Sequence, residues 1–272
     1  MSNITLIVPT YRNPKYLDLL LRSATENLVD TNNHILVIVD GFFEESKDIL
    51  AKYPNVRYLE LERNQGMQAA INMGVMQAET ECVFVVNDDN VMPGEWDKRV
   101  LSVVHHMRPM RQLVLTVNQV EPTGPSMFDF IIRDFGQSAE TFQYNDWIEY
   151  EKTLPNPGTS SGGRIFPFVM QKKHYLAMGG MDTFFNSPNI CDWDFFLRLG
   201  LMGFVFYRTH VLHLYHFGSV STKKNAESAA FRQREQQAML EYEFKWGAKP
   251  HNEPGTNNKL PPDGKFRGFI IQ

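Results

Sequence analysis

The sequence predicts an α/β fold with a mostly parallel central sheet flanked by helices. Short apolar runs, such as Ile4 to Val8 and Val83 to Val86, have the length and β-branched content of buried strands. Segments whose apolar residues recur at helical spacing separate these runs. Because strand and helix alternate regularly within the first 90 residues, we expect a doubly wound sheet with right-handed crossovers.

The first half of the chain supplies these elements in order. Ile4 to Val8 is the first predicted strand, and Asn13 is placed to cap a helix that begins at Pro14. The other predicted elements of this half are strands at 35–39, 56–61 and 82–86 and helices at 44–53 and 66–77.

Two adjacent carboxylates, Asp88 and Asp89, follow the last of these strands. Like charges this close are unfavourable unless a cation neutralises them, and Mg²⁺ is commonly shared between carboxylates and substrate phosphates. A metal–diphosphate site is therefore one hypothesis. The alternative is a plain turn, since residues 87–90 followed by Pro93 and Gly94 have favourable turn composition.

The carboxyl ends of parallel strands meet at one edge of a sheet, so Thr10, Tyr11 and Asp40 are expected near the acidic pair. A nucleotide suits this crevice, with Tyr11 stacking on the base and Asp40 accepting from its N–H groups. The G-x-G-x-x-G and P-loop patterns are absent, so neither a nicotinamide enzyme nor a P-loop phosphotransferase is supported.

The composition gives no support for a nucleic-acid-binding protein or for a disulfide-rich secreted protein. The 272 residues carry a net charge of −4, from 27 basic and 31 acidic side chains, without the basic signature of a nucleic-acid-binding protein. Two cysteines are too few for a disulfide framework, and no pattern of them suggests zinc. This favours a reducing, cytoplasmic location. No apolar run approaches the roughly 20 residues that span a bilayer, and peripheral membrane contact stays open.

The second half is less regular. We predict helices at 96–106, 172–178 and 223–246, strands at 113–117, 165–170 and 204–207, and a tail from 248 to 272. Between 121 and 159 prolines and glycines interrupt the pattern, and we interpret its many aromatic residues mainly as core. Thr159 to Gly163 is expected to be a flexible loop that could cover a bound ligand.

Six motifs in this order resemble those of family 2 glycosyltransferases of the GT-A type, a Rossmann-like fold, and the resemblance covers residues 4–222. The motifs are Ile-Val-Pro-Thr-Tyr-Arg-Asn (7–13), Val-Ile-Val-Asp-Gly (37–41), Asn-Gln-Gly-Met-Gln-Ala-Ala-Ile-Asn-Met-Gly (64–74), Asn-Asp-Asp-Asn (87–90), Gly-Gly-Met-Asp-Thr-Phe-Phe (179–185) and Cys-Asp-Trp-Asp-Phe-Phe-Leu-Arg-Leu (191–199). Each motif is weak alone, but their order and spacing are specific.

The resemblance implies a set of donor-binding residues and a metal site. The implied nucleotide-binding residues are Pro9, Thr10, Tyr11, Asp40, Asn64, Gly66 and Asp88. Asp88 and Asp89 occupy the position of the family's DxD-type motif, with Asp89 as a ligand of Mn²⁺ or Mg²⁺ and His216 completing the metal shell. Phe42 departs from the small polar residue that the family often has there, which leaves the base identity open.

The resemblance also implies the catalytic and acceptor residues. Asp192 matches the family's general base, although the family's preceding glutamate is Cys191 here. Asp194 either caps the following helix or contacts the acceptor, and Gly179 and Gly180 are expected beneath a bound sugar. A simple capping role for either aspartate is the alternative.

Three histidines, His210, His213 and His216, recur every third residue. Zinc binding is one reading of such a group, but the segment is strand-like and alternates faces, so the spacing alone is unconvincing. His213 is the second choice for the metal ligand.

The combined prediction is a metal-dependent, inverting glycosyltransferase that moves a sugar from a nucleoside diphosphate sugar, with UDP favoured, to an acceptor hydroxyl. The alternatives are a non-catalytic nucleotide-sugar or glycan-binding module and a sugar-phosphate nucleotidyltransferase. The acceptor stays open among a glycan, a lipid-linked sugar, a protein and a modified nucleic acid. We expect a donor half at 1–118, an acceptor and catalytic half of the same domain at 119–222, and a C-terminal helix and tail at 223–272.

Overall fold

The computed structural model describes residues 3–107, 112–124, 130–185, 190–218, 229–247 and 249–250. Its N-terminal part contains β1 (Ile4–Thr10), α1 (Pro14–Glu26), β2 (His34–Asp40), α2 (Phe43–Leu50), β3 (Arg57–Leu61), α3 (Met67–Gln77), β4 (Cys82–Val85), β5 (Asn90–Val91) and α4 (Trp96–His106). The remainder contains β6 (Leu113–Glu121), β7 (Ile131–Ile132), α5 (Tyr144–Thr153), β8 (Thr159–Ser161), β9 (Phe168–Gln171), α6 (Lys172–Ala177), α7 (Cys191–Leu201), β10 (Val205–His216) and α9 (Ala229–Trp246).

One mostly parallel sheet connects both halves of the chain. Its strand order is β3-β2-β1-β4-β9-β6-β10-β5, with β7 beside β6 and β8 beside β10. β3, β2, β1 and β4 run parallel, as do β6 and β10, while β9 is antiparallel to both β4 and β6. The predicted fold class is confirmed.

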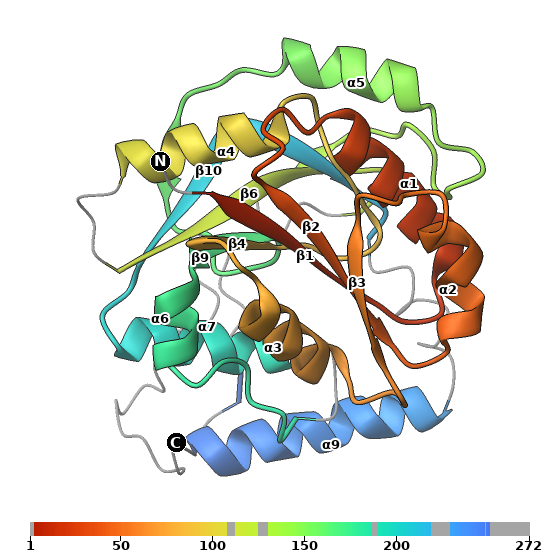
Figure 1. Ribbon diagram of the computed structural model, residues 1–272. Coiled ribbons are helices and arrows are strands. Elements are labelled where there is room, and N and C mark those ends of the chain that lie inside the picture. Colours follow the sequence, from red (N-terminus) through yellow and green to blue (C-terminus); the bar gives the residue numbers. More distant parts are fainter. Residues whose placement is uncertain are drawn as a thin grey trace.

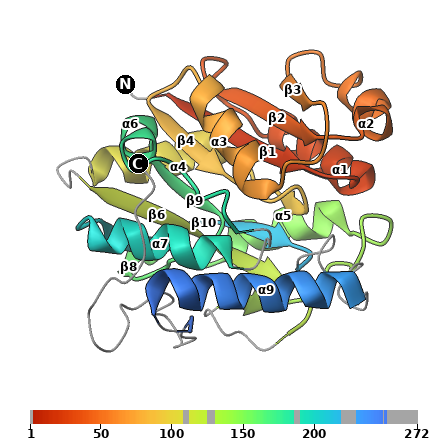
Figure 2. The same ribbon diagram turned by 90° about the horizontal axis from the view of Figure 1, so that it is seen from below.

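Helices cover both faces of this sheet (Figures 1 and 2). Alternate residues of β1 explain why: Ile4, Leu6 and Val8 pack in a core cluster with α1 and α4, whereas Ile7 packs in the opposite cluster with α3, α7 and α9. Because side chains alternate across a strand, a strand that is apolar on both faces requires a helical layer on each side.

The segment from 121 to 159 contains a helix that the sequence pattern did not predict. α5 buries Trp147 against Phe135 and Tyr215 in a third core cluster. Interpreting the aromatics as core is correct for the described residues Phe130, Phe135 and Trp147. The helix was missed because its packing partners come from distant segments and the surrounding Pro and Gly residues hide its period.

The expectation of a flexible covering loop at Thr159 to Gly163 is wrong. Thr159–Ser161 forms β8, which pairs antiparallel with residues 207–209 of β10. Gly163 then packs so closely on Thr116 that an added Cβ would lie 2.9 Å from the Thr116 Cβ. Backbone pairing on one side and this close approach on the other fix the segment to the sheet.

The C-terminal helix belongs to the core. Ala238, Tyr242 and Trp246 of α9 are buried in the cluster that also contains α3 and α7, and Figure 2 shows α9 running alongside α7. Residues 223–228 and most of the predicted tail lie outside the described residues. Among the helices that are described, none is both long and apolar enough to cross a membrane.

Candidate active site

The carboxyl ends of β1 and β4 bring together the first group of polar residues. Thr10 donates from Oγ1 to Oδ2 of Asp88 over 2.7 Å, and the side-chain amide of Asn13 donates to Asp88 Oδ1 over 3.0 Å. Asn13 is the N-cap residue of α1, but its side chain makes no capping hydrogen bond. The local sequence signal therefore located the helix start correctly and missed the partner of the Asn13 side chain.

Asp88 is a buried carboxyl whose charge is unfavourable. Burial raises its pKa to about 7, and the neighbouring charge of Asp89 acts in the same direction, while the bonds from Thr10 and Asn13 oppose it. A group that donates a proton or carries positive charge would be favoured beside such a pair of carboxylates.

Asp89 lies against His216 at the end of β10, and Glu121 lies on the other side of the ring. His216 Nε2 is 3.4 Å from Asp89 Oδ1, and Nδ1–H donates to Glu121 Oε1 over 2.7 Å. Burial alone would lower the pKa of His216, but Asp89 and Glu121 outweigh it and raise the pKa to about 10.

Asp89 and His216 could supply two ligands to a divalent cation. Two cis ligands in an octahedral shell lie about 3 Å apart, close to the separation of the Asp89 and His216 atoms. A carboxylate that accepts from the other ring nitrogen is the usual partner of a metal-binding histidine, and Glu121 is such a carboxylate. Within the described ranges, no three His, Cys, Asp or Glu side chains could hold a metal ion by themselves, so oxygens of a bound ligand would have to complete the shell.

The sequence pattern missed Glu121. It is the last residue of β6, and it reaches His216 because β6 also pairs with β10, a strand distant in sequence. The one sequence feature that could have indicated Glu121 is that it ends a strand, as Thr10 and Asp40 do.

Asp40 holds the loop that precedes α3 through hydrogen bonds. Its carboxylate accepts from Asn64 Nδ2 (2.9 Å), Gln65 N (2.6 Å) and Gly66 N (2.9 Å). Burial raises the pKa of Asp40, and the two backbone bonds counteract this. The structure thus brings Asp40, Asn64 and Gly66 together, and the Asp40 oxygens accept hydrogen bonds from the loop before α3.

Pro9 and Tyr11 flank Thr10 differently. Pro9 is a buried residue of β1 and lies opposite Ile38 of β2. It is therefore part of the sheet. Tyr11 follows the strand and is exposed beside Phe42, with ring centroids 5.7 Å apart.

Asp192 lies in the first turn of α7, away from the N-cap position, which is Ile190. Its Oδ1 accepts from the Trp193 backbone N–H over 2.8 Å. Burial raises the Asp192 pKa to about 7, and the charge of Glu235 on α9 adds to the shift. A carboxyl with this pKa is well matched to proton transfer near neutral pH.

The expectation that Asp194 caps α7 or contacts an acceptor is not supported. Asp194 is 0% exposed, and it accepts from Arg198 Nε, Trp246 Nε1 and Lys245 Nζ at 2.7, 2.9 and 2.7 Å. Lys245 also pairs with Asp182, 2.6 Å away. Because three donors from α7 and α9 enclose this carboxylate, we assign it to holding the two helices together.

Gly179 and Gly180 form a turn that packs against α3. Asn72 of α3 both donates to Met181 O and accepts from Met181 N, each over 2.8 Å. A Cβ on Gly180 would lie 2.5 Å from Asn72 Oδ1, whereas one on Gly179 would meet nothing within 4 Å. The close approach of Asn72 is therefore a sufficient reason for a glycine at position 180, and contact with a bound sugar is not needed to explain it.

Of the three histidines, only His216 lies at the acidic group. A register shift between Thr209 and His213 separates their surroundings. His210 pairs with Asn118 and Ser160, while the backbone N–H of His213 donates to Glu151. Burial, with the charges of His210 and Arg99, lowers the His213 pKa to about 4. His213, the second choice for the metal ligand, therefore lies beside Glu151 and away from Asp88 and Asp89.

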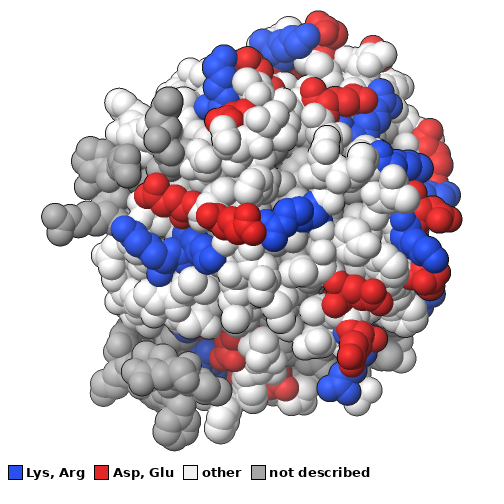
Figure 3. Space-filling model, viewed as in Figure 1, with Lys and Arg blue, Asp and Glu red and all other residues white. Residues whose placement is uncertain are grey.

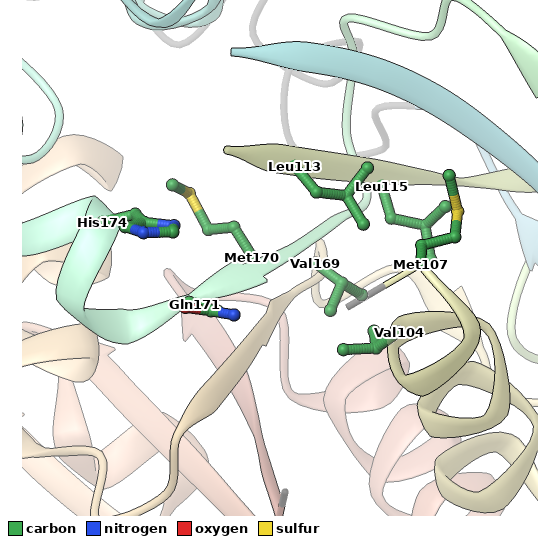
Figure 4. Close-up of a pocket in the computed structure, with 8 residues that line it drawn as sticks. All are labelled: Val104, Met107, Leu113, Leu115, Val169, Met170, Gln171 and His174. Atoms are coloured by element: carbon green, nitrogen blue, oxygen red, sulfur yellow. The ribbon is translucent and has the colours of Figure 1, made fainter. Parts of the chain in front are cut away.

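A small apolar pocket lies at the opposite end of the strands (Figure 4). It is lined by residues of α4, β6, β9 and α6, including Leu113 at the start of β6 and Gln171 at the end of β9. Glu121, at the other end of β6, belongs to the polar group. The pocket is thus separate from the candidate site. On the face in Figure 3, basic and acidic side chains of described residues are interspersed, without one large patch of a single sign.

The chain is similar to known glycosyltransferases. Residues 5–121 match the model of glycosyl transferase family 2. The glycosyltransferase YwdF of Bacillus subtilis, described as uncharacterized, is 25% identical over 204 residues, covering 72% of this chain and 67% of YwdF. TarS of Staphylococcus aureus, a poly(ribitol-phosphate) β-N-acetylglucosaminyltransferase, is 31% identical over 113 residues, covering 39% of this chain and 20% of TarS.

The fold agrees with these sequence matches. The crystal structure of S. aureus TarS residues 1–349 superposes with a TM-score of 0.55 at 16% identity, covering 89% of this chain and 72% of that one. These matches confirm the predicted resemblance to family 2 glycosyltransferases of the GT-A fold and the predicted enzyme class. The TarS structures include complexes with UDP and with UDP-GlcNAc.

Proposed function

We propose that this glycosyltransferase transfers a sugar from a nucleoside diphosphate sugar, with UDP favoured, to an acceptor hydroxyl with inversion at the anomeric carbon. The observation that carries the proposal is the convergence of Thr10, Asn13, Asp88, Asp89 and His216 at the carboxyl edge of a GT-A sheet. The TarS complexes with UDP and UDP-GlcNAc support a uridine nucleotide as the donor group.

The chemistry requires one base and one neutralised leaving group. Asp192 takes the proton of the acceptor hydroxyl, the hydroxyl oxygen bonds to the sugar C1, and the C1–O bond to the diphosphate breaks, releasing the nucleoside diphosphate. A divalent cation, Mn²⁺ or Mg²⁺ held by Asp89 and His216, would offset the negative charge of that diphosphate. Thr10 and Asn13 hold Asp88 in place beside the donor.

The alternatives have less support. The family match favours a transferase over a binding module or a nucleotidyltransferase.

Calorimetric titration with UDP, CDP, GDP and ADP, with Mn²⁺ and with a chelator, tests the donor site. We expect Mn²⁺-dependent binding of one nucleotide and a loss of more than about tenfold in affinity for Asp89→Ala, since even outer-shell groups change metal affinity 10- to 100-fold. Asp192→Asn should retain nucleotide affinity. If none of the four nucleotides binds with or without Mn²⁺, the donor-site proposal is wrong.

Glu121→Gln tests whether Glu121 orients His216. Its side chain accepts the Nδ1–H of the ring, so we expect the neutral amide to lower Mn²⁺ affinity by about 10- to 100-fold in the presence of UDP. Mn²⁺ titration followed by electron paramagnetic resonance measures this directly. Glu60→Gln, an exposed glutamate near the end of β3, is the matched control. Equal Mn²⁺ affinity in the two variants would refute the role of Glu121.

A further inference from the structure

Two side chains of α3 are hydrogen-bonded to a segment that is distant in the sequence, residues 180–185. Asn72 accepts from the Met181 backbone N–H and donates to the Met181 carbonyl, each over 2.8 Å. One turn earlier in α3, the buried Gln68 donates from Nε2 to the Phe185 carbonyl over 2.7 Å. Residues i and i+4 lie on the same face of a helix, so both side chains bind one segment from one side.

The Asn72 amide is itself held in place. Tyr175, which is 1% exposed, donates from its hydroxyl to Asn72 Oδ1 over 2.6 Å. Gly180 leaves the room that this amide needs, because a Cβ there would lie 2.5 Å from Asn72 Oδ1. A side-chain amide that bonds both backbone polar groups of one residue fixes the distance and the orientation of that residue together. Such a buried network is rigid when its members are satisfied.

The helix α3 is fixed in turn to the strands that carry the candidate donor site. Its Gly74 packs so closely on β1 and β2 that an added Cβ would lie 2.6 Å from Ile7 Cγ2 and 3.1 Å from Ile38 Cδ1. Asp40, at the end of β2, accepts from the backbone N–H of Gly66, the N-cap residue of α3. The helix therefore cannot shift along the sheet without disturbing these strands.

The same segment, residues 180–185, is also tied to α7. Lys245 of α9 lies 2.6 Å from Asp182 and 2.7 Å from Asp194, which is in the first turn of α7. One cation thus joins the segment to the turn that also carries Asp192. The contacts run without a break from the strands of the donor site, through α3 and the segment, to the start of α7.

We propose that Gln68 and Asn72 are positioning residues for the reaction, which hold residues 180–185 on α3 and thereby set the place of Asp192 relative to the donor site. This inference rests on the proposed function, since it takes Asp192 as the base. The reason for two amides here is geometric. Apolar packing alone tolerates small shifts, whereas a displacement of about 1 Å at a reacting group lowers the rate by about 100-fold.

Gln68→Met tests this role, because methionine has a similar volume but no donor for the Phe185 carbonyl. Gln77→Met, at the exposed last residue of the same helix, is the matched control. The two measurements are UDP affinity with Mn²⁺ by calorimetry, and the rate of UDP release from UDP-GlcNAc with Mn²⁺ and water as acceptor. We expect Gln68→Met to lower the rate by about 10- to 100-fold and to leave the affinity within about twofold, and Gln77→Met to change neither.

Hydrogen–deuterium exchange of the free protein gives a second readout that needs no substrate. In Gln68→Met we expect the backbone amides of α7 to exchange about 5- to 100-fold faster, the range for leaving one buried hydrogen-bonding group without its partner. The amides of β1 should keep their protection. If Gln68→Met does not fold, Asn72→Asp should give the same pattern, because it keeps the acceptor for the Met181 N–H and loses the donor to the Met181 carbonyl.

The outcomes separate this inference from the proposed function. A rate of UDP release in Gln68→Met within about twofold of that in Gln77→Met would overturn the positioning role, and so would unchanged exchange of α7. Equal acceleration of exchange in β1 and α7 would also refute it, since the whole domain would then be destabilised. If the unmodified protein neither binds UDP nor releases it from UDP-GlcNAc, the choice of a uridine donor fails, while the exchange of α7 still decides whether Gln68 and Asn72 hold this helix.

Discussion

Asp192→Asn is expected to lower kcat by about 10² to 10⁴, the usual contribution of a positioned general base, without changing nucleotide affinity by more than about twofold. The amide has nearly the same shape but cannot take the proton of the acceptor hydroxyl. Asp192 lies partly buried in the first turn of α7 and keeps its place there through the Trp193 backbone N–H, so the substitution should leave the helix intact.

The pH profile gives a second readout of the same residue. Burial raises the Asp192 pKa to about 7. A base works only when ionised, so kcat/KM should rise with increasing pH through about 7 and then level off, and this rise should disappear in Asp192→Asn. Initial rates of nucleoside diphosphate release between pH 5 and 9 measure it.

Asp146→Asn is the matched control for this prediction, because Asp146 is an exposed aspartate in the first turn of another helix, α5. Its kinetic constants should match those of the unmodified protein. A loss of less than tenfold in Asp192→Asn would mean that another group is the base.

Lys245→Met is expected to lower the free energy of unfolding by about 3–5 kcal/mol, the usual cost of removing one partner of a buried ion pair. The Lys245 side chain is 7% exposed and neutralises Asp182 and Asp194 together. Methionine fills a similar volume but leaves the buried Asp194 and the partly buried Asp182 with less compensation, so the packing of α9 on α7 should weaken. Urea denaturation followed by circular dichroism gives the unfolding free energy.

Lys98→Met provides the control, since Lys98 pairs with Glu95 on the exposed surface of α4, where such pairs contribute about 0–1 kcal/mol. Adding Asp182→Asn to Lys245→Met should recover part of the loss, because it removes one of the uncompensated charges. Similar losses for Lys245→Met and Lys98→Met would show that the buried cluster does not hold α9.

Local sequence patterns determined most of the N-terminal sheet and part of the site. Runs such as Ile4 to Val8 are apolar on both faces and can only be interior strands of a layered α/β fold. Since parallel strands present their carboxyl ends at one edge, residues at the ends of these runs, including Thr10, Asp40 and Asp88, were placed together from sequence alone. The ordered motifs added the resemblance to family 2 glycosyltransferases, and residues 5–121 match the model of that family.

Side-chain partners were decided by the tertiary structure. Asn13 resembles a helix cap in sequence, but its amide donates to a buried carboxylate 75 positions away. An unpaired buried charge costs more than an unmade helix cap. Glu121 reaches His216 only because β6 and β10 are neighbours in the sheet, a pairing that no local pattern encodes.

Asp192 and Asp194 show the same limit most clearly. They are two residues apart on one helix, so their side chains point about 200° apart, and sequence alone did not tell which one faces the protein interior. The structure decides this through α9, whose Lys245 and Trp246 enclose Asp194 and leave Asp192 as the candidate base. Sequence by itself therefore determined which residue types stand at the strand ends and helix starts, because these depend on local periodicity. Only tertiary packing determined which of them carry a buried structural charge and which remain available for chemistry, because that depends on neighbours distant in the chain.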